Sequence, residues 1–159
     1  MEPPIENDSE YYPMPGFPTL MVSNLPESCQ FYVNGLGFRP VFSIPGPGGQ
    51  PVLEHIRFCR YADLLLEQEP AGDRESAGPR GLGVRLTFSL PLAQRNAEEM
   101  AQRARDLGAL VEGPVERPWN TRDVVVTDPD GYALVFTEPV DMTATFAQVL
   151  ENAAASPFA

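Results

Sequence analysis

The segment PWNTRDVVVTDPDGYALVFTEP, residues 118–139, predicts a β-hairpin. Two β-rich runs, Asp123 to Thr127 and Tyr132 to Thr137, flank the turn sequence DPDG at 128–131. Proline fixes φ at the second turn position, aspartate suits the third, and glycine takes the positive φ needed to enter the next strand. The second strand alternates between a face of larger residues (Tyr132, Leu134, Phe136) and a face of smaller residues (Ala133, Val135, Thr137). Such alternation indicates a sheet with one face on a core, which leaves the smaller-residue face for function.

Length and charge limit the classes of function. With 159 residues, 43% of them hydrophobic, the chain is long enough for one good core. Its formal charge of −11 argues against nucleic acid or an anionic membrane as a partner, because both are polyanions. The charge favours a cationic ligand or partner, or it simply keeps the protein in solution.

Cysteine and histidine are scarce. Cys29 and Cys59 are not spaced as a metal-binding pair, and a single histidine, His55, excludes a two-histidine metal site. His55 and Arg57 share one face of a strand, which points either to a cleft or to solvent. No segment resembles a signal peptide or a membrane span, so we expect a reduced, cytoplasmic environment.

The chain divides into two similar halves. An acidic, proline-rich arm over 1–16 precedes a strand (17–22), a helix that Asn24 caps and that runs to about Asn34, and three strands (41–44, 52–59 and 62–68). After a linker over 71–81, a strand (82–90), a helix that begins at an Asn96–Glu99 capping box and three more strands repeat this order. We expect a single domain over 17–139 with modules 17–70 and 82–139, followed over 140–159 by a helix capped by Asp141 and a tail.

Two phrases carry a family resemblance. The helix phrase SCQFY at 28–32, leading to LGF at 36–38, and the turn phrase DPDGY at 128–132 resemble the vicinal oxygen chelate superfamily of glyoxalases, bleomycin-resistance proteins and extradiol dioxygenases. The resemblance covers roughly 17–139. It implies an α+β fold in which two tandem βαβββ modules form a curved mixed sheet around a cleft, and it leaves the reaction open.

The resemblance also places the metal ligands of the family's enzymes. They would fall here on Phe17, Leu65, Arg85 and Val135, none of which is a metal ligand. A shift of register would put Asp63 or Glu67 in place of Leu65 and would restore one ligand only. The chain therefore resembles the metal-free, drug-binding branch, and we expect no metal and no cofactor.

The face assignments predict the residues that line the cleft. The candidate ligand-binding residues are Phe17, Thr19, Met21, Asp63, Leu65, Glu67, Arg85, Thr87, Trp119 and Val135. Arg85 either binds a ligand's carboxylate or forms an internal ion pair with Asp63 or Glu67. Trp119 either stacks on a flat or cationic ligand or packs at a core edge or dimer seam. No catalytic residue is assigned.

These observations predict a metal-independent protein of the bleomycin-resistance type that sequesters an antibiotic or related natural product. We expect the ligand to be a small organic molecule of cationic or aromatic character. The resemblance implies a homodimer, with no nucleic acid or membrane partner. The alternatives are a lyase, isomerase or dioxygenase-like enzyme of the same fold, and a non-catalytic accessory domain.

Overall fold

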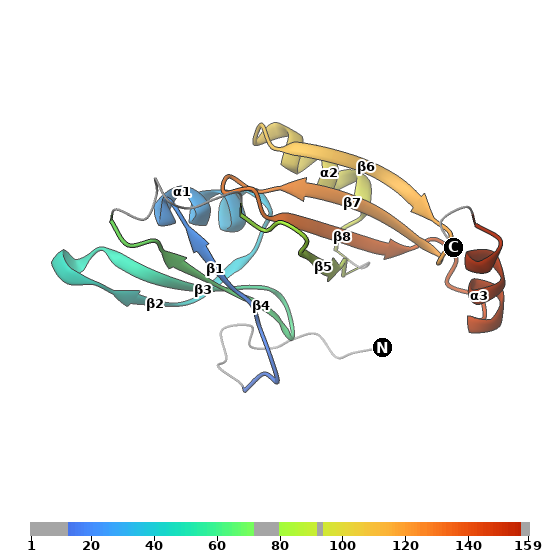
Figure 1. Ribbon diagram of the computed structural model, residues 1–159, viewed down its shortest axis with the longest axis horizontal. Helices are drawn as coiled ribbons and strands as arrows, with labels where there is room; N and C mark the ends of the chain where they lie inside the picture. Colours follow the sequence, from blue (N-terminus) through green and yellow to red (C-terminus); the bar gives the residue numbers. More distant parts are fainter. Residues whose placement is uncertain (1–12, 72–79, 92–93, 157–159) are drawn as a thin grey trace. The chain divides into compact units, whose positions relative to one another are not determined.

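The computed structural model describes residues 13–71, 80–91 and 94–156 (Figure 1). Most of the expected arm (1–16) and linker (71–81) lies outside these residues. The elements, in chain order, are β1 (Thr19–Val22), α1 (Leu25–Cys29), the π-helical turn η1 (Gln30–Gly35), β2 (Arg39–Pro45), the 3-10 turn η2 (Pro47–Gly49), β3 (Pro51–Cys59), β4 (Ala62–Gln68), β5 (Arg85–Ser89), α2 (Ala97–Asp106), β6 (Leu110–Arg117), β7 (Thr121–Thr127), β8 (Ala133–Pro139) and α3 (Phe146–Ala154).

The chain forms two compact units, each built on a four-stranded mixed sheet. The first unit holds the described residues up to Leu82 and the turn Asp128–Gly131, and its strand order is β1-β4-β3-β2. The second holds the rest, and its order is β5-β8-β7-β6. In each sheet one parallel pair joins the first strand of a module to its last. The predicted α+β fold of two βαβββ modules is therefore confirmed.

The first helix begins where the sequence predicts. The Asn24 side chain accepts a hydrogen bond from the Glu27 amide at 3.3 Å, and Pro26 lies in the first turn, where its missing N–H costs nothing. The helix was expected to stay regular to about Asn34. Instead it widens into η1, where the Leu36 amide donates to the Phe31 carbonyl, five residues back. A π-helical turn contains one residue more than an α-helical turn, which rotates the buried face of the helix, and Phe31 is buried beside Tyr32.

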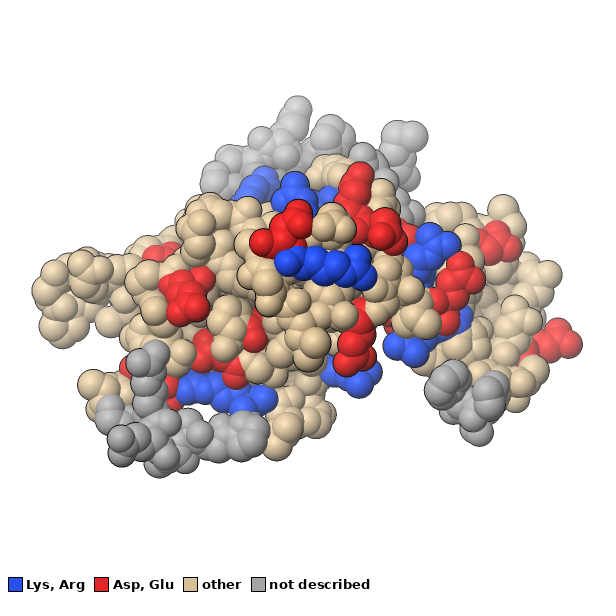
Figure 2. Space-filling view, turned by 90° about the horizontal axis from the view of Figure 1, so that it is seen from above, with Lys and Arg blue, Asp and Glu red and all other residues tan. Residues whose placement is uncertain are grey.

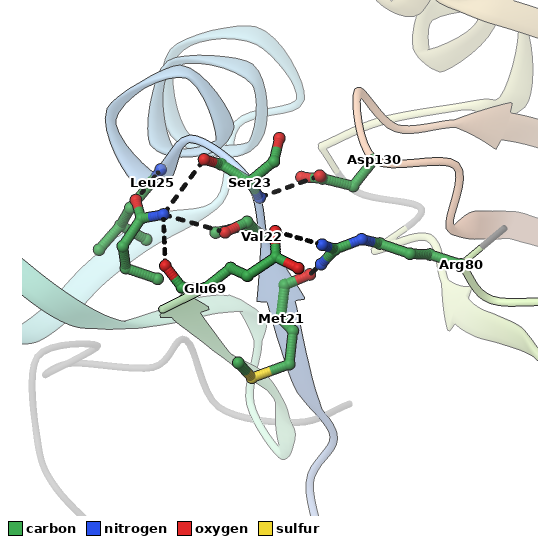
Figure 3. Close-up of polar contacts among 8 residues, drawn as sticks. Met21, Val22, Ser23, Leu25, Glu69, Arg80 and Asp130 are labelled. Atoms are coloured by element: carbon green, nitrogen blue, oxygen red, sulfur yellow. Dashed lines mark hydrogen bonds and ion pairs between the residues drawn. The ribbon is translucent and has the colours of Figure 1, made fainter. Parts of the chain in front are cut away.

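A polar cluster fixes the junction between β1, β4 and α1 (Figure 3). The Gln68 side chain accepts from the Leu25 amide at 2.9 Å and donates to the Ser23 carbonyl at 3.1 Å. Arg80 forms a largely buried ion pair with Glu69 and also donates to the Met21 carbonyl. These bonds satisfy backbone groups that the strand end and the helix start would otherwise leave unpaired.

The DPDG turn forms as predicted and belongs to the first unit. The Gly131 amide donates to the Asp128 carbonyl at 3.0 Å, and Gly131 has a φ of 96°. The Ser23 amide donates to Oδ1 of Asp130 at 2.9 Å (Figure 3). The two acidic side chains of this turn thus bond within the first unit, while the strands beside the turn lie in the second.

In the second unit, α2 packs on one face of the sheet (Figure 1). The predicted cap is present, since Asn96 accepts from the Glu99 amide at 2.9 Å. Met100, Ala101 and Ala104 are fully buried on the helix side, as are Leu134 and Phe136 in β8. The larger-residue face of the opening hairpin is therefore the core face, and the smaller-residue face is turned away from α2.

The final helix differs from the prediction in where it begins. Thr145, rather than Asp141, is its N-cap and forms a capping box with Gln148. Asp141 instead accepts from the amide and hydroxyl of Thr143 at 2.7 and 2.6 Å, which lowers the pKa of its carboxyl. α3 carries no buried residue. Over the described residues, no helix combines the length and apolar character that crossing a membrane requires.

Candidate functional site

A cavity of about 370 Å³ lies in the second unit, on the sheet face opposite α2. Its lining residues come from β5 to β8 and from the β6–β7 turn: Arg85, Thr87, Arg117, Trp119, Thr121, Asp123, Val125, Val135 and Thr137. Its volume is in the range of about 300–1,000 Å³ that is usual for small-molecule sites. An apolar floor with a few polar groups suits an organic ligand.

The pairing of β7 with β8 positions the floor. Val125 lies opposite Val135, and Asp123 lies opposite Thr137. Because side chains alternate along a strand, these four point to the same face of the sheet. The two valines are almost fully buried, whereas Trp119, in the turn after β6, leaves 48% of its surface exposed. The cavity thus combines a closed aliphatic floor with an accessible aromatic ring.

Three charged side chains line the cavity, and two of them pair. Nε of Arg117 lies 3.3 Å from Oδ2 of Asp123, and the Thr137 hydroxyl donates to Oδ1 of Asp123 at 2.7 Å. Both oxygens of this carboxylate are thus occupied. Arg85 is exposed, and it has no acidic partner among the ion pairs of residues 13–71, 80–91 and 94–156.

Four of the candidate ligand-binding residues line this cavity, Arg85, Thr87, Trp119 and Val135, and so does Thr137 from the smaller-residue face of the hairpin. The prediction missed four residues of the cavity: Arg117, Thr121, Asp123 and Val125. The sequence of the hairpin was sufficient to predict Asp123 and Val125. Once the four-residue turn sets Val125 opposite Val135, alternation along β7 puts Asp123 on the same face. For Arg117 and Thr121 the necessary signal was the β6–β7 register, which a bulge between Glu112 and Val115 displaces.

The other predicted residues lie in the first unit. Thr19 and Met21 alternate with the buried Leu20 and Val22 of β1, and Asp63, Leu65 and Glu67 alternate with the buried Leu64 and Leu66 of β4. Phe17 precedes β1, and its ring stacks on His55 with centroids 6.2 Å apart.

A buried charge cluster occupies the first unit's sheet. Asp63 accepts from Nε and Nη2 of Arg57, both at 2.8 Å, and its Oδ2 lies 2.7 Å from Nε2 of His55. The side chains of Arg57 and Asp63 are each only 1% exposed. The sequence allows Asp63 as an internal ion-pair partner for Arg85, whereas in the structure Asp63 pairs with Arg57 and His55 of its own unit. The sequence left open whether His55 and Arg57 face a cleft or the solvent. In the structure both lie on the sheet face that carries Asp63.

The cluster orients the imidazole ring of His55 through Nε2. An ionised carboxylate only accepts hydrogen bonds, so the hydrogen between His55 and Asp63 sits on Nε2. Nδ1 is buried, and among the described residues it finds no hydrogen-bond partner. The rings of Phe17 and Phe42 flank the imidazole, the latter edge-on with centroids 4.9 Å apart.

The residues present do not fit a divalent metal. The two sheets have matching registers, with Thr19 opposite Leu65 in one and Thr87 opposite Val135 in the other. The metal positions that the resemblance implies, Phe17, Leu65, Arg85 and Val135, carry hydrocarbons and a guanidinium, and the register partners Thr19 and Thr87 carry hydroxyls. None of these groups is a good ligand for a divalent metal. Within the described part of the chain, no three His, Cys, Asp or Glu side chains are grouped to hold a metal ion.

Cys29 and Cys59 form no disulfide bond within the described residues. Burial, with a smaller contribution from Glu54, raises the pKa of the Cys29 thiol to about 11. The reactive form of cysteine is the thiolate, so Cys29 is poorly suited to be a nucleophile.

Fold and sequence comparisons define the class of protein. Among solved structures, the antibiotic binding protein TnmS3 from Streptomyces sp. CB03234 is 24% identical, with a TM-score of 0.55 over 77% of this chain and 93% of that one. TioX from Micromonospora sp. ML1 is 18% identical, with a TM-score of 0.57 over 77% and 96%. At this identity the likeness shows the glyoxalase fold.

Sequence comparison shows the family to which the chain belongs. Residues 16–136 match the Glyoxalase/Bleomycin resistance protein/Dioxygenase superfamily, and the chain belongs to it. The Mycobacterium bovis protein Mb0911c is 28% identical over 126 residues, covering 77% of this chain and 82% of that protein. Rv0887c of Mycobacterium tuberculosis is also 28% identical over 126 residues, covering 77% and 73%.

Proposed function

We propose that this protein is a cytoplasmic, metal-independent small-molecule binding protein that sequesters an antibiotic or related natural product without altering it. The observation that carries the proposal is the second unit's cavity, with its valine floor, its threonine hydroxyls and the accessible ring of Trp119. The solved relative TnmS3 is an antibiotic binding protein, which supports the same ligand class. The metal positions that the family resemblance implies hold Phe17, Leu65, Arg85 and Val135, whose hydrocarbon and guanidinium side chains support binding without a metal.

A thermal-shift screen tests the proposal. Metal-free protein is heated with cationic, neutral and acidic aromatic antibiotics, with and without divalent metals. A ligand at a hundred times its Kd stabilises the folded state by about 2.7 kcal/mol. We expect stabilisation by at least one compound without metal, and recovery of that compound unchanged by mass spectrometry. Stabilisation that requires metal, or chemical change of the compound, would reject sequestration.

Two variants locate the site. Trp119→Ala removes the aromatic wall, and we expect it to abolish most of the ligand-induced shift while leaving the melting temperature of the free protein nearly unchanged, since this ring is half exposed. Tyr61→Ala, which removes an exposed aromatic side chain in the first unit, is the matched control and should retain the full shift.

The second candidate function is a metal-free enzyme of the same fold. The His55–Asp63 pair favours it, because an imidazole held through Nε2 by a carboxylate leaves Nδ1, a buried atom, as the candidate general base. Phe17 and Phe42 would supply apolar walls around that nitrogen. Turnover of a stabilising compound that is lost in His55→Gln but retained in Trp119→Ala would favour this function over sequestration.

The assembly proposed is a homodimer. Its support is the apolar surface of the C-terminal segment, where Met142, Phe146 and Leu150 are exposed. Light scattering on the purified chain tests the assembly, and a dimer that Phe146→Asp converts to a monomer would place α3 at the interface. A monomer at all concentrations would reject it.

A further inference from the structure

The cavity of the second unit has the opposite sign of charge to the chain as a whole. Two arginines and one aspartate line it, for a formal charge of +1, while the chain carries −11. Fields from exposed charges are screened within about 8 Å at physiological ionic strength, so a bound ligand senses mainly the lining residues. Acidic and basic side chains are also interspersed on the face of the molecule drawn in Figure 2, so the acidity of the chain as a whole is a poor guide to the ligand.

Within the cavity the positive charge is concentrated at one residue. Asp123 holds Arg117 through Oδ2 and the Thr137 hydroxyl through Oδ1, which leaves this carboxylate little capacity for a cationic ligand. Arg85 lies exposed at the start of β5, with no acidic partner in the part of the chain that the structure describes. A guanidinium offers parallel N–H donors that match a carboxylate in a two-point contact.

Trp119 and Arg85 lie toward different ends of the second unit's sheet. Arg85 is opposite Ala133 at the start of β8, and Thr121, close after Trp119 in the chain, is opposite Pro139 at its end. An extended strand of this length spans roughly 20 Å, less the reach of the two side chains. A molecule that contacts both is elongated, with an aromatic part at one end and its polar group at the other.

We propose that the cavity binds an elongated aromatic acid, with its carboxylate on Arg85 and its ring on Trp119. This inference rests on the proposed function, since it names the ligand class of the same cavity. It reverses the expectation of a cationic ligand that the net charge suggests. The valines below supply the apolar contact for the middle of the molecule.

The test uses three probes with one aromatic body and three charges: biphenyl-4-acetic acid, its primary amide, and 2-(biphenyl-4-yl)ethylamine. Trp119 is the only tryptophan of the chain, so selectively excited tryptophan fluorescence reports directly on this cavity. We expect the acid to bind about tenfold or more tighter than the amide, which is the usual gain from a charged hydrogen-bond pair, and the amine to bind weakest.

Variants of Arg85 separate the effect of its charge on probe affinity from the effect of its two-point hydrogen-bond geometry. Arg85→Gln should lower the affinity for the acid to that for the amide and leave the amide unaffected, while Arg85→Lys should retain only part of the preference because it loses the two-point contact. Arg103→Gln removes the same charge from the exposed face of α2 and should change nothing. Both sites are exposed, so these variants should fold.

The outcomes distinguish the inference from the function on which it rests. Equal binding of acid and amide, tightest binding of the amine, or an acid preference that survives Arg85→Gln would overturn the acid ligand and leave a small-molecule binding cavity. No binding by any of the three probes would count against both, and the thermal-shift screen then decides separately whether the chain binds other compounds.

Discussion

The phenol oxygen of Tyr32 lies 2.7 Å from Oδ2 of Asp128, and both side chains are buried. The two residues are 96 positions apart, one in η1 and the other in the turn between β7 and β8. Asp128 also accepts from the Asp130 amide through Oδ1 at 3.0 Å. The first unit therefore includes a turn that comes from the far end of the chain.

Removing this hydroxyl should destabilise the protein substantially. In Tyr32→Phe the ring is kept, but a buried carboxylate loses a hydrogen bond, and such a loss costs about 1.5–3 kcal/mol. Urea unfolding monitored by circular dichroism measures the change in the free energy of unfolding. Tyr61→Phe is the control, because its exposed ring should make the same substitution nearly neutral. Equal stability of the two variants would contradict a structural role for the Tyr32–Asp128 bond.

Neutralising Asp63 should cost more than neutralising a neighbouring acid. Asp63→Asn removes the carboxylate charge that Arg57, whose side chain is 1% exposed, contacts through Nε and Nη2, and breaking a buried pair costs about 3–5 kcal/mol. Glu67→Gln, at an exposed position of the same strand, should change stability by less than about 0.5 kcal/mol. The free energies of unfolding of both variants give the comparison. A small effect of Asp63→Asn would mean that water reaches the cluster.

Cys29 should react slowly with thiol reagents and with a steep pH dependence. With a pKa of about 11, roughly 0.1% of the thiol is ionised at pH 8, compared with about a quarter for an ordinary cysteine. In a Cys59→Ser background, the alkylation rate of the folded protein should rise about tenfold per pH unit until the pH approaches that pKa. A rate that levels off near pH 9 would show that burial does not raise the pKa.

Divalent metals should not bind stoichiometrically. The positions that the family's metal enzymes use hold side chains without suitable donors, so zinc, manganese or nickel would have to lose water ligands without replacement. Metal analysis of protein purified without chelator, and calorimetric titration with each metal, check this. One metal bound per chain with micromolar affinity or tighter would contradict the prediction. The metal affinity of Asp63→Asn would then show whether that acid is a ligand.

Much of the fold could be predicted because its signals are local. The DPDG turn, the asparagine caps at Asn24 and Asn96, and the alternation along β8 each act within a few residues, where sterics and capping dominate. Three cavity residues, Arg85, Thr87 and Val135, were predicted in the same way, since strand alternation assigns a side chain to a face without knowledge of its neighbours. The repeated order of elements then predicted two modules.

What the tertiary structure decided depends on contacts between distant residues. The register of β3 against β4 puts Arg57 opposite Asp63, and the register of β7 against β8 brings Asp123 to Thr137. The π-helical turn that buries Phe31 and the docking of Asp128 on Tyr32 likewise depend on how elements pack. By itself the sequence determined which side chains share a face. Pairing between strands determined which charges neutralise each other, because a buried charge is stable only beside its partner. Among the ion pairs of the described residues, none includes Arg85.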